Sequence, residues 1–297
     1  MKKTDITVSL VNYKTQDLLL KCIETLKKHT RNVSYEIIVL DNASEDDTIL
    51  KIKKKFPEVI TIQSKKNLYA TRGNNKVFKR AKGEYFLVLN PDMEFSENVL
   101  FKMKDFLDKN KTVAAVSCRQ YYKDKTQQNT ASMFPTPLIE FWENNMLGRF
   151  FQNKKALENF RYVGWDRKST RVVEMIPDTI MMIRTDVGRK LGMYDPKIKL
   201  MYMENDLCIR IKNLGYSVCH LGDVSILHHV GQSTKQIPSL ELFKIYQEDR
   251  FYYYKKHFGI LWGVFIFVTF QVNYLYYLFE PFINILRNKK TLPNASF

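Results

Sequence analysis

The chain has 297 residues and a hydrophobic fraction of 45%, which is enough to build a core, so the composition excludes a disordered protein. Its formal net charge of +16 suits nucleic acid, an anionic membrane surface or phosphorylated ligands as partners. The sequence has no helix-turn-helix signature, zinc-finger spacing or aromatic-basic strand motif, so we expect no nucleic-acid partner.

The first 118 residues predict alternating strands and helices. Apolar runs predict strands at residues 6–11, 35–40, 59–63, 85–89 and 113–118. Apolar residues at helical spacing predict helices at residues 18–26, from about 44 onward, at 73–81 and at 99–107. Strands and helices that alternate with short links are typical of a Rossmann-like, doubly wound, mostly parallel α/β sheet with right-handed crossovers.

The strand predicted at residues 85–89 leads directly to an acidic residue. Its unbroken apolar run is typical of a strand buried on both faces of a parallel sheet. Pro91 ends the strand, so Asp92 follows its carboxyl end, where open α/β sheets bind their ligands. Asp92 is therefore a candidate metal or phosphate ligand. Asp41 ends the strand at 35–40 in the same way, although a turn or a helix cap also explains an aspartate there.

Beyond residue 118 the pattern weakens and then returns. Residues 119–171 have no clean period and predict loops and short helices that shape a substrate pocket. Strands are predicted at 172–176, 179–183 and 224–227, and helices at 186–191 and 205–214. The last of these helices follows Glu204 and contains Asp206. Both acidic residues are candidate site residues, although an i,i+4 ion pair with Arg210 is the alternative explanation for Asp206.

The carboxyl-terminal region has a different character. A helix is predicted at residues 242–252, and residues 259–279 then contain no charged side chain. As a helix, this stretch would be roughly 30 Å long, about the thickness of a bilayer's hydrocarbon core. Basic residues flank both ends, which disfavours a single crossing. We expect an embedded or re-entrant helical anchor, broken at Pro281, on an anionic membrane surface; a true span and a buried core helix are the alternatives.

Cysteine usage and the amino terminus both indicate the cytoplasm. The four cysteines, at positions 22, 118, 208 and 219, have no CxxC spacing, so they predict buried free thiols rather than a zinc site or disulfides. The first apolar run is interrupted by Asp5 and Asn12 and is too short for a secretory signal. We therefore expect the catalytic part at the cytoplasmic face of the cell membrane.

Six sequence blocks occur in a familiar order. They are Val8 to Tyr13, Asp41-Asn42-Ala43-Ser44, Asn67 to Asn75, Leu89-Asn90-Pro91-Asp92, Glu204 to Arg210, and His228 to Ser233. Together they resemble glycosyltransferase family 2, in particular its rhamnosyltransferase-like branch, over about residues 5–258. The resemblance implies a GT-A fold and inverting transfer of a sugar from a nucleotide diphosphate donor.

The resemblance also implies roles at the donor end of the site. The donor-binding residues would be Val11, Tyr13, Asp41, Asn67, Arg72, Asn75 and Asp92. Among them, Asp41 would contact the nucleoside, and Val11 and Tyr13 would line the base pocket. Asp92 matches the last acidic position of the family's metal motif, which suits Mg²⁺ or Mn²⁺. His228 matches a position that contacts metal or phosphate in some relatives; a buried structural histidine is the alternative.

At the acceptor end, Glu204 aligns with the family's catalytic base. A carboxylate within hydrogen-bond reach can take the proton of the acceptor hydroxyl as that hydroxyl attacks the anomeric carbon. Asp206, from the same block, would support this catalytic step and is the second candidate for the base. Asp178 and Arg210 are expected at the acceptor or sugar pocket, although an aspartate after a proline also suits a turn.

The chain departs from the family's pattern at three places. Asn90 replaces the first aspartate of the commoner metal motif, so one motif carboxylate remains. Tyr69 and Ala70 stand where relatives usually have glycine and an aromatic residue, and Pro177-Asp178 stand where a small residue is common. The loss of the first aspartate implies modest metal affinity. The other two departures bear on sugar specificity more than on reaction class.

We predict a GT-A catalytic domain at residues 1–238, with a nucleotide-sugar-binding half at 1–118 and an acceptor half at 119–238. A helical membrane-association region would follow at 239–297. The predicted activity is sugar transfer from dTDP-rhamnose or a UDP-sugar to a lipid-linked or cell-surface polysaccharide. A sugar nucleotidyltransferase is one alternative, although residues 12–15 are not a Gly-rich phosphate loop, and a catalytically silent membrane scaffold is another.

Overall fold

One mixed sheet carries the fold. The computed structural model describes residues 4–229 and 234–286. The strands are β1 (Ile6–Asn12), β2 (Tyr35–Asp41), β3 (Ile60–Gln63), β4 (Tyr85–Leu89), β5 (Met93–Glu94), β6 (Val113–Tyr121), β7 (Arg171–Val173), β8 (Ile180–Arg184) and β9 (Ser217–His228). The α-helices are α1 (Gln16–His29), α2 (Thr48–Lys55), α3 (Tyr69–Phe78), α4 (Val99–Lys109), α5 (Pro137–Asn144), α6 (Lys154–Phe160), α7 (Thr185–Leu191), α8 (Met203–Asn213), α9 (Ser239–Phe258) and α10 (Ile260–Leu286). Two short 3₁₀ turns are η1 (Gly148–Phe150) and η2 (Thr234–Gln236).

The strand order confirms a mostly parallel α/β sheet. The order is β3-β2-β1-β4-β8-β6-β9-β5, and β7 pairs with β9. The strands β3, β2, β1 and β4 are parallel to one another, and β6 is parallel to β9. The strand β8 runs antiparallel between β4 and β6. The sequence predicts a strand at this position but not its direction, because a run of apolar residues is the same in both orientations.

Two helical layers cover the two faces of the sheet. The strand β4 is buried along its whole length, as its apolar run predicts. Residues of α1 and α4, such as Ile23 and Met103, pack on one face of the sheet. Residues of α3, α7 and α8, such as Val77 and Leu207, pack on the other face. The carboxyl ends of β1, β2 and β4 therefore lie at one edge of the sheet. The four cysteines are buried free thiols, as predicted.

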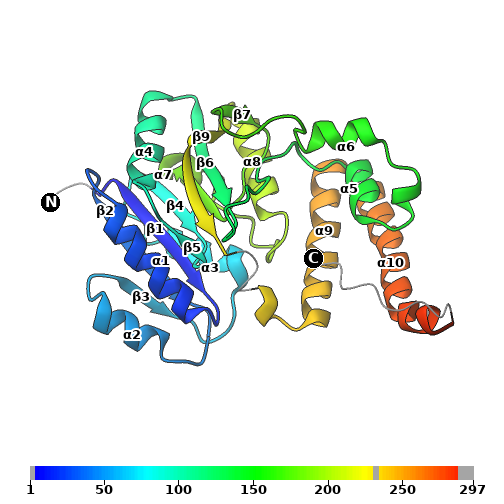
Figure 1. The fold of residues 1–297 in the computed structure, drawn as a ribbon, viewed down its shortest axis with the longest axis horizontal. Coiled ribbons are helices and arrows are strands. Elements are labelled where there is room, and N and C mark those ends of the chain that lie inside the picture. The colour runs from blue at the N-terminus through cyan, green and yellow to red at the C-terminus, as the bar shows by residue number, and fades with distance from the viewer. Residues whose placement is uncertain (1–3, 230–233, 287–297) are drawn as a thin grey trace.

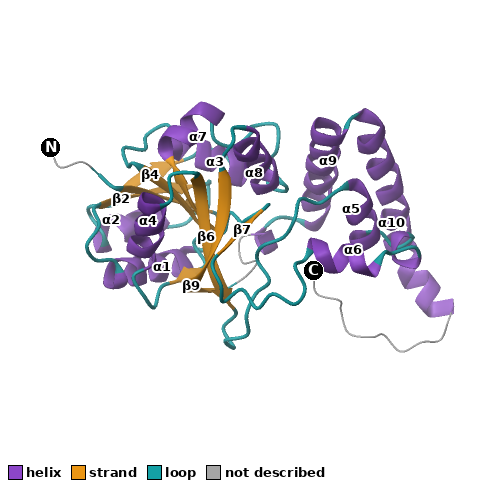
Figure 2. Ribbon diagram, turned by 90° about the horizontal axis from the view of Figure 1, so that it is seen from above, coloured by secondary structure: helices purple, strands orange, loops and turns teal. Residues whose placement is uncertain are grey.

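A group of helices lies beside the sheet. Figures 1 and 2 show α5, α6, α9 and α10 together at one side of the sheet domain. Tyr253 and Tyr254 of α9 form a buried cluster with Ile266 and Phe270 of α10. The α5 end is joined to α10 by the Asn145 amide, which donates to the carbonyl of residue 269 at 2.9 Å. The helical hairpin of α9 and α10 therefore has a core of its own.

The carboxyl-terminal helix differs from its prediction in one respect. The helix α10 continues from Ile260 to Leu286 without the break expected at Pro281, and one of its faces packs on α9. Within residues 4–229 and 234–286, no helix is both long enough and apolar enough to cross a membrane.

Candidate active site

Asp41 organises the carboxyl edge of the sheet. Its Oδ1 accepts hydrogen bonds from the Asn12 amide at 2.9 Å and the Ser44 hydroxyl at 2.5 Å. Its Oδ2 accepts from the Gln63 amide at 2.7 Å and from the backbone N–H of Ser44 at 3.1 Å. The carboxylate thus ties together the ends of β1, β2 and β3. Its predicted contact with the donor nucleoside stays a prediction.

The loop before α3 has an unusual backbone. Tyr69 has a φ of +55°, in the left-handed region where residues other than glycine and asparagine are strained. The Asn67 carboxamide accepts the Tyr69 N–H at 2.8 Å and holds this turn. The Tyr69 hydroxyl donates to Glu241 of α9, and this hydrogen bond raises the pKa of Tyr69 to about 12. Asn67 therefore shapes the loop, and Tyr69 ties it to the helical hairpin.

Other residues expected at the donor end have structural partners. Val11 packs against Gly73, where an added Cβ would lie 2.8 Å from the valine Cγ1. Asn75 uses both polar atoms of its amide on the backbone of Tyr194, at 2.7 and 3.1 Å. Arg72 donates to the carbonyl of Pro196 at 3.2 Å. Asn75 thus fixes the loop after α7, and the structure adds no support for its predicted donor contact.

Asp92 and His228 form the metal-binding candidate. The Asp92 carboxylate is buried, and its Oδ1 lies 3.5 Å from His228 Nε2. That Oδ1 has no hydrogen-bond partner within the described ranges. The other ring nitrogen of His228, Nδ1, lies 3.0 Å from Gln128 Oε1. If Nδ1 donates this hydrogen bond, the lone pair of Nε2 points toward Asp92, which is the orientation of a metal-binding histidine.

Two side chains alone do not complete a metal site. The part of the chain that the structure describes contains no group of three or more His, Cys, Asp and Glu side chains placed to hold an ion. The buried Oδ1 of Asp92, which has no hydrogen-bond partner within the described ranges, and the imidazole of His228 nevertheless fit a hard divalent cation. Such an ion would take its other ligands from a diphosphate. Asp92 and His228 would be the two protein ligands.

Asp178 and Glu204 are neighbouring carboxylates next to this pair. Asn90, two residues before Asp92, donates its N–H to the carbonyl of residue 179 at 2.8 Å, which places Asp178 beside the end of β4. Burial raises the pKa of Asp178 to about 6, and a nearby His228 opposes that shift. Burial also raises the pKa of Glu204 to about 8, reinforced by the negative charge of Asp178. As whole residues, both are half-buried.

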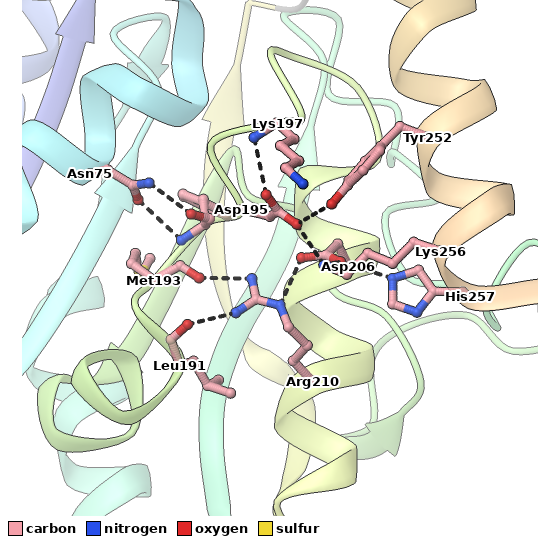
Figure 3. A network of polar contacts seen from close by, with 11 residues as sticks. Asn75, Leu191, Met193, Asp195, Lys197, Asp206, Arg210, Tyr252, Lys256 and His257 are labelled. Carbon is pink, nitrogen blue, oxygen red and sulfur yellow. Dashed lines mark hydrogen bonds and ion pairs between the residues drawn. The ribbon is translucent and has the colours of Figure 1, made fainter.

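Asp206 lies only two residues beyond Glu204 but in a different environment. Figure 3 shows Arg210 of α8 and Lys256 and His257 of α9 around it. Its carboxylate accepts from Arg210 Nε at 2.7 Å, Lys256 Nζ at 2.5 Å and His257 Nε2 at 2.8 Å. Burial opposes ionisation, but these donors lower the pKa of Asp206 to about 2. Asp206 is fully buried, which suits the predicted support role, and its part in catalysis stays a prediction.

The predicted place of Arg210 at the acceptor or sugar pocket stays a prediction. Each of its three guanidinium nitrogens donates a hydrogen bond within the fold (Figure 3). Besides Asp206, it donates to the carbonyls of Leu191 at 3.0 Å and Met193 at 2.7 Å. Its guanidinium therefore joins α8 to the end of α7 and the residues that follow it.

The helix α9 supports the segment that carries Glu204. The Asp249 carboxylate accepts the backbone N–H groups of residues 199, 200 and 201 at 2.8–2.9 Å. Tyr202, at a φ of +63°, stacks on Tyr253 with ring centroids 4.9 Å apart. Arg250, itself paired with Glu140 at 3.0 Å, donates to the Tyr202 hydroxyl at 3.3 Å. The residues immediately before the candidate base are thus held by α9.

Sequence reasoning missed these supporting residues. Gln128, which orients His228, lies in the segment without periodicity, and Asp249 lies in a helix predicted only as part of a membrane region. Their partners are about 50 to 100 residues away in the chain, so no local pattern indicates them. The predicted boundary at residue 238 stays a prediction, although Asp249, Tyr253, Lys256 and His257 all contact the sheet domain across it.

Comparisons with known proteins match this architecture. The model of the family described as glycosyl transferase family 2 matches residues 7–172. A poly(ribitol-phosphate) beta-glucosyltransferase of Bacillus spizizenii is 30% identical over 112 residues, which cover 36% of this chain and 18% of that protein. The O-antigen biosynthesis protein RfbC of Myxococcus xanthus is 21% identical over 241 residues, which cover 79% of this chain and 18% of that protein.

A solved structure shows the same fold. The crystal structure of GalNAc-T7 with UDP, GalNAc and Mn²⁺ superposes with a TM-score of 0.58 at 12% identity. The match covers 76% of this chain and 44% of that chain. At this identity the similarity supports a GT-A-like fold alone, and the chain spans less than a fifth of the length of both curated relatives.

Proposed function

Because the chain belongs to glycosyl transferase family 2, we propose that it transfers a sugar from a nucleotide diphosphate donor to a cell-envelope glycan, with inversion at the anomeric carbon. The two relatives, a poly(ribitol-phosphate) glucosyltransferase and an O-antigen biosynthesis protein, support an envelope polymer as the acceptor. The donor would be dTDP-rhamnose or a UDP-sugar, and the acceptor a lipid-linked or cell-surface chain.

One observation carries the proposal: the half-buried Glu204 beside Asp178, next to the Asp92–His228 pair. A carboxylate with a pKa of about 8 holds a proton more firmly than an ordinary glutamate, which makes its ionised form a stronger base. The pair of carboxylates lies at the carboxyl edge of the sheet, where ligands bind in this class of fold.

In the proposed reaction, the Glu204 carboxylate takes the proton of the acceptor hydroxyl while the hydroxyl oxygen attacks the anomeric carbon. The bond between that carbon and the diphosphate oxygen breaks, and its electron pair leaves with the nucleoside diphosphate. Attack from the face opposite the leaving group inverts the anomeric centre. Glu204 later loses the proton to water, and Asp178 would orient a sugar hydroxyl near the base.

Asp92 and His228 would hold a divalent cation, Mg²⁺ or Mn²⁺. When bound, such an ion offsets the negative charge that develops on the departing diphosphate. The Oδ1 of Asp92 and the imidazole of His228 would supply one oxygen and one nitrogen ligand. With a single motif carboxylate, we expect modest metal affinity.

A donor panel tests the reaction. The protein would be incubated with dTDP-rhamnose and several UDP-sugars, with and without Mg²⁺ or Mn²⁺, and free UDP or TDP would be measured. We expect diphosphate release from one donor, faster when a lipid-linked glycan is added and lost on chelation. The Asp92→Asn variant should need a higher Mn²⁺ concentration for half-maximal rate. Release from no donor, with any acceptor or ion, would contradict the enzyme proposal.

The same proposal includes contact with a membrane surface. On α10, Leu261, Val264, Val268 and Val272 share one exposed face, and Leu261 is 82% exposed. Beside α10, η1 ends in Phe150 and is followed by Phe151, which are 79% and 74% exposed. Arg149, Lys154 and Lys155 flank these rings, and a basic segment with exposed aromatic residues suits an anionic lipid interface.

Co-sedimentation with vesicles tests this contact. We expect the full chain to bind phosphatidylserine vesicles, and the double variant Leu261→Asp with Val268→Asp to lose most of the binding, because two charges would enter the apolar interface. The matched control is Leu50→Asp with Val172→Asp, since both residues are exposed apolar side chains on other elements. Equal binding by the two double variants would contradict the assignment of this surface.

A further inference from the structure

A basic groove runs along α3 and includes Arg72 and Asn75 from the expected donor end. It has a volume of about 820 Å³ and is lined by Leu68, Arg72, Asn75, Lys76, Phe78, Lys79, Arg189, Gly192 and Pro196. Arg72, Lys76 and Lys79 follow one another at helical spacing, so they share one face of α3 and its carboxyl-terminal cap. Arg189, in the last turn of α7, also lines the groove and donates to the carbonyl of Ala81, just after α3, at 3.3 Å.

The charge of this groove is not neutralised by the protein. Its lining contains four cations and no carboxylate. Within the described ranges, none of the four forms an ion pair, whereas many other surface lysines, such as Lys27, Lys55 and Lys109, pair with acidic residues. Arg72 and Arg189 each donate to a backbone carbonyl, which orients them without cancelling their charge. The groove therefore presents an uncompensated positive surface to an anionic ligand.

The position of the groove connects it to the candidate active site. Its first lining residue, Leu68, donates its N–H to Asn42 in the loop that follows β2. The next turn of α3 contacts the segment of the candidate base, because the Thr71 hydroxyl lies 3.1 Å from Met203 Sδ. From Arg72 to Lys79 the cations then extend about 10 Å away from this point, at 1.5 Å per helical residue.

The chemistry of the lining distinguishes between ligands. A groove for a neutral sugar chain usually offers an exposed aromatic ring, but Phe78, the aromatic residue of the lining, is buried. Several cations spaced along one wall suit a ligand that carries several phosphates along its length. A single nucleotide would use only part of this wall.

We propose that the groove binds a phosphodiester-linked glycan or polyol chain, the anionic part of the acceptor. This inference rests on the proposed function, since it assigns the acceptor's chemical class. The chain's end would reach Glu204, and its phosphodiesters would contact Arg72, Lys76, Lys79 and Arg189.

Fluorescence anisotropy with a labelled glycerol-phosphate octamer tests the proposal. The assay contains no donor, so it succeeds or fails independently of sugar transfer. We expect Lys76→Glu with Lys79→Glu to weaken binding about 10-fold or more at 50 mM salt and to reduce the salt dependence of binding, because fewer counterions are released. The matched control is Lys53→Glu with Lys54→Glu, which changes the net charge equally on the exposed face of α2, away from the residues that line this groove. Melting temperatures would verify that both double variants fold.

The outcomes separate the alternatives. Weaker binding in the groove variant alone supports the proposal, and Glu204→Gln should bind the octamer normally while losing transfer. Equal weakening in both charge-reversal variants, or in neither, overturns it, because binding would then follow net charge or another surface. Competition by a neutral dextran octamer overturns the anionic class. Tighter binding of single-stranded RNA of equal charge through the same lysines overturns the glycan as the occupant and assigns nucleic acid instead.

Discussion

Glu204 and Asp206 show how the environment of a residue decides its role. They lie in the same helical turn, and sequence patterns treat them as members of one acidic block. Glu204 has a like-charged neighbour and no cationic partner among its hydrogen bonds, so its pKa rises to about 8. Asp206 has three cationic donors, so its pKa falls to about 2. One carboxylate can accept a proton near neutral pH and the other cannot.

The first prediction concerns the base. Glu204→Gln should retain donor binding and lower the transfer rate by about 100-fold or more, the usual contribution of a general base. In the unmodified protein the rate should rise with pH through about 8 as Glu204 loses its proton. Asp178→Asn removes the neighbouring negative charge, so the rise in rate should occur at a lower pH. If the rate of Asp178→Asn rose at the same pH as that of the unmodified protein, the coupling of the two carboxylates would be contradicted.

A stability measurement checks the same assignment without substrate. The pKa of Glu204 rises from 4.5 to about 8 in the folded protein, so folding favours its protonated form. Its contribution to stability is therefore complete below pH 4.5 and declines as pH rises through about 8. The Glu204→Gln variant lacks this decline, so its melting temperature should exceed that of the unmodified protein at pH 9 by more than at pH 5.

At the scale of elements, α9 supports α8, the helix that carries Glu204. It contributes Asp249 to the loop at 199–201, Tyr253 to the stack on Tyr202, and Lys256 and His257 to Asp206. The helix α8 begins at Met203 after a left-handed residue, a conformation that persists only where its surroundings hold it. Precision at Glu204 thus depends on a helix that lies 35 or more positions later in the chain.

The second prediction tests this support. Asp249→Ala removes the acceptor of three backbone N–H groups, so it should lower stability by about 3 kcal/mol. It should also lower kcat more than it raises the donor KM, since a displacement of about 1 Å at a catalytic group can reduce the rate 100-fold. Asp249→Asn, which keeps one carbonyl oxygen, should recover part of the rate.

Glu248→Ala is the matched control on the neighbouring position. The Glu248 side chain is 60% exposed and, among the residues that the structure describes, pairs with Lys199 alone, so its loss should change stability by about 0.5 kcal/mol or less. Urea unfolding and steady-state kinetics measure both quantities. If the two variants behaved alike, α9 would not position the base.

At the scale of the whole molecule, much of the fold was predictable. The strands β1, β2 and β4 match their predicted ranges within one residue, because buried parallel strands are continuous apolar runs. The strand β9 begins seven residues before its predicted start, because His220, Gly222 and Asp223 interrupt its apolar pattern. The helix α3 begins at Tyr69 rather than at 73, because its first turn has no apolar face to detect.

The candidate site was predictable only in part. Asp92, Asp178, Glu204 and His228 follow from strand ends and from the family resemblance, and the structure brings these four together. The hydrogen bonds of Arg210 and Asn75 could not be predicted, since their partners are backbone carbonyls and amides of a loop that has no sequence signature. Contacts between distant segments decide which polar residues remain available to a ligand.

The third prediction concerns the boundary at residue 238. A chain ending there lacks Lys256 and His257, so Asp206 would stay buried with only Arg210 as a partner. Removing partners from a buried charge destabilises a protein by about 3–5 kcal/mol. We expect residues 1–238 alone to be unfolded or molten by near-UV circular dichroism and inactive. A cooperatively melting, active fragment would instead confirm the two-domain division.

The hydrogen bond between Tyr69 and Glu241 has a consequence for protein engineering. It joins the loop at the donor end to the first turn of the hairpin, so these two parts cannot be exchanged independently. A chimaera that takes α9 and α10 from a relative with glycine at position 69 would leave the strained tyrosine without its anchor. Such grafts should therefore transfer residues 67–70 together with the hairpin, and natural sequences should change positions 69 and 241 in concert.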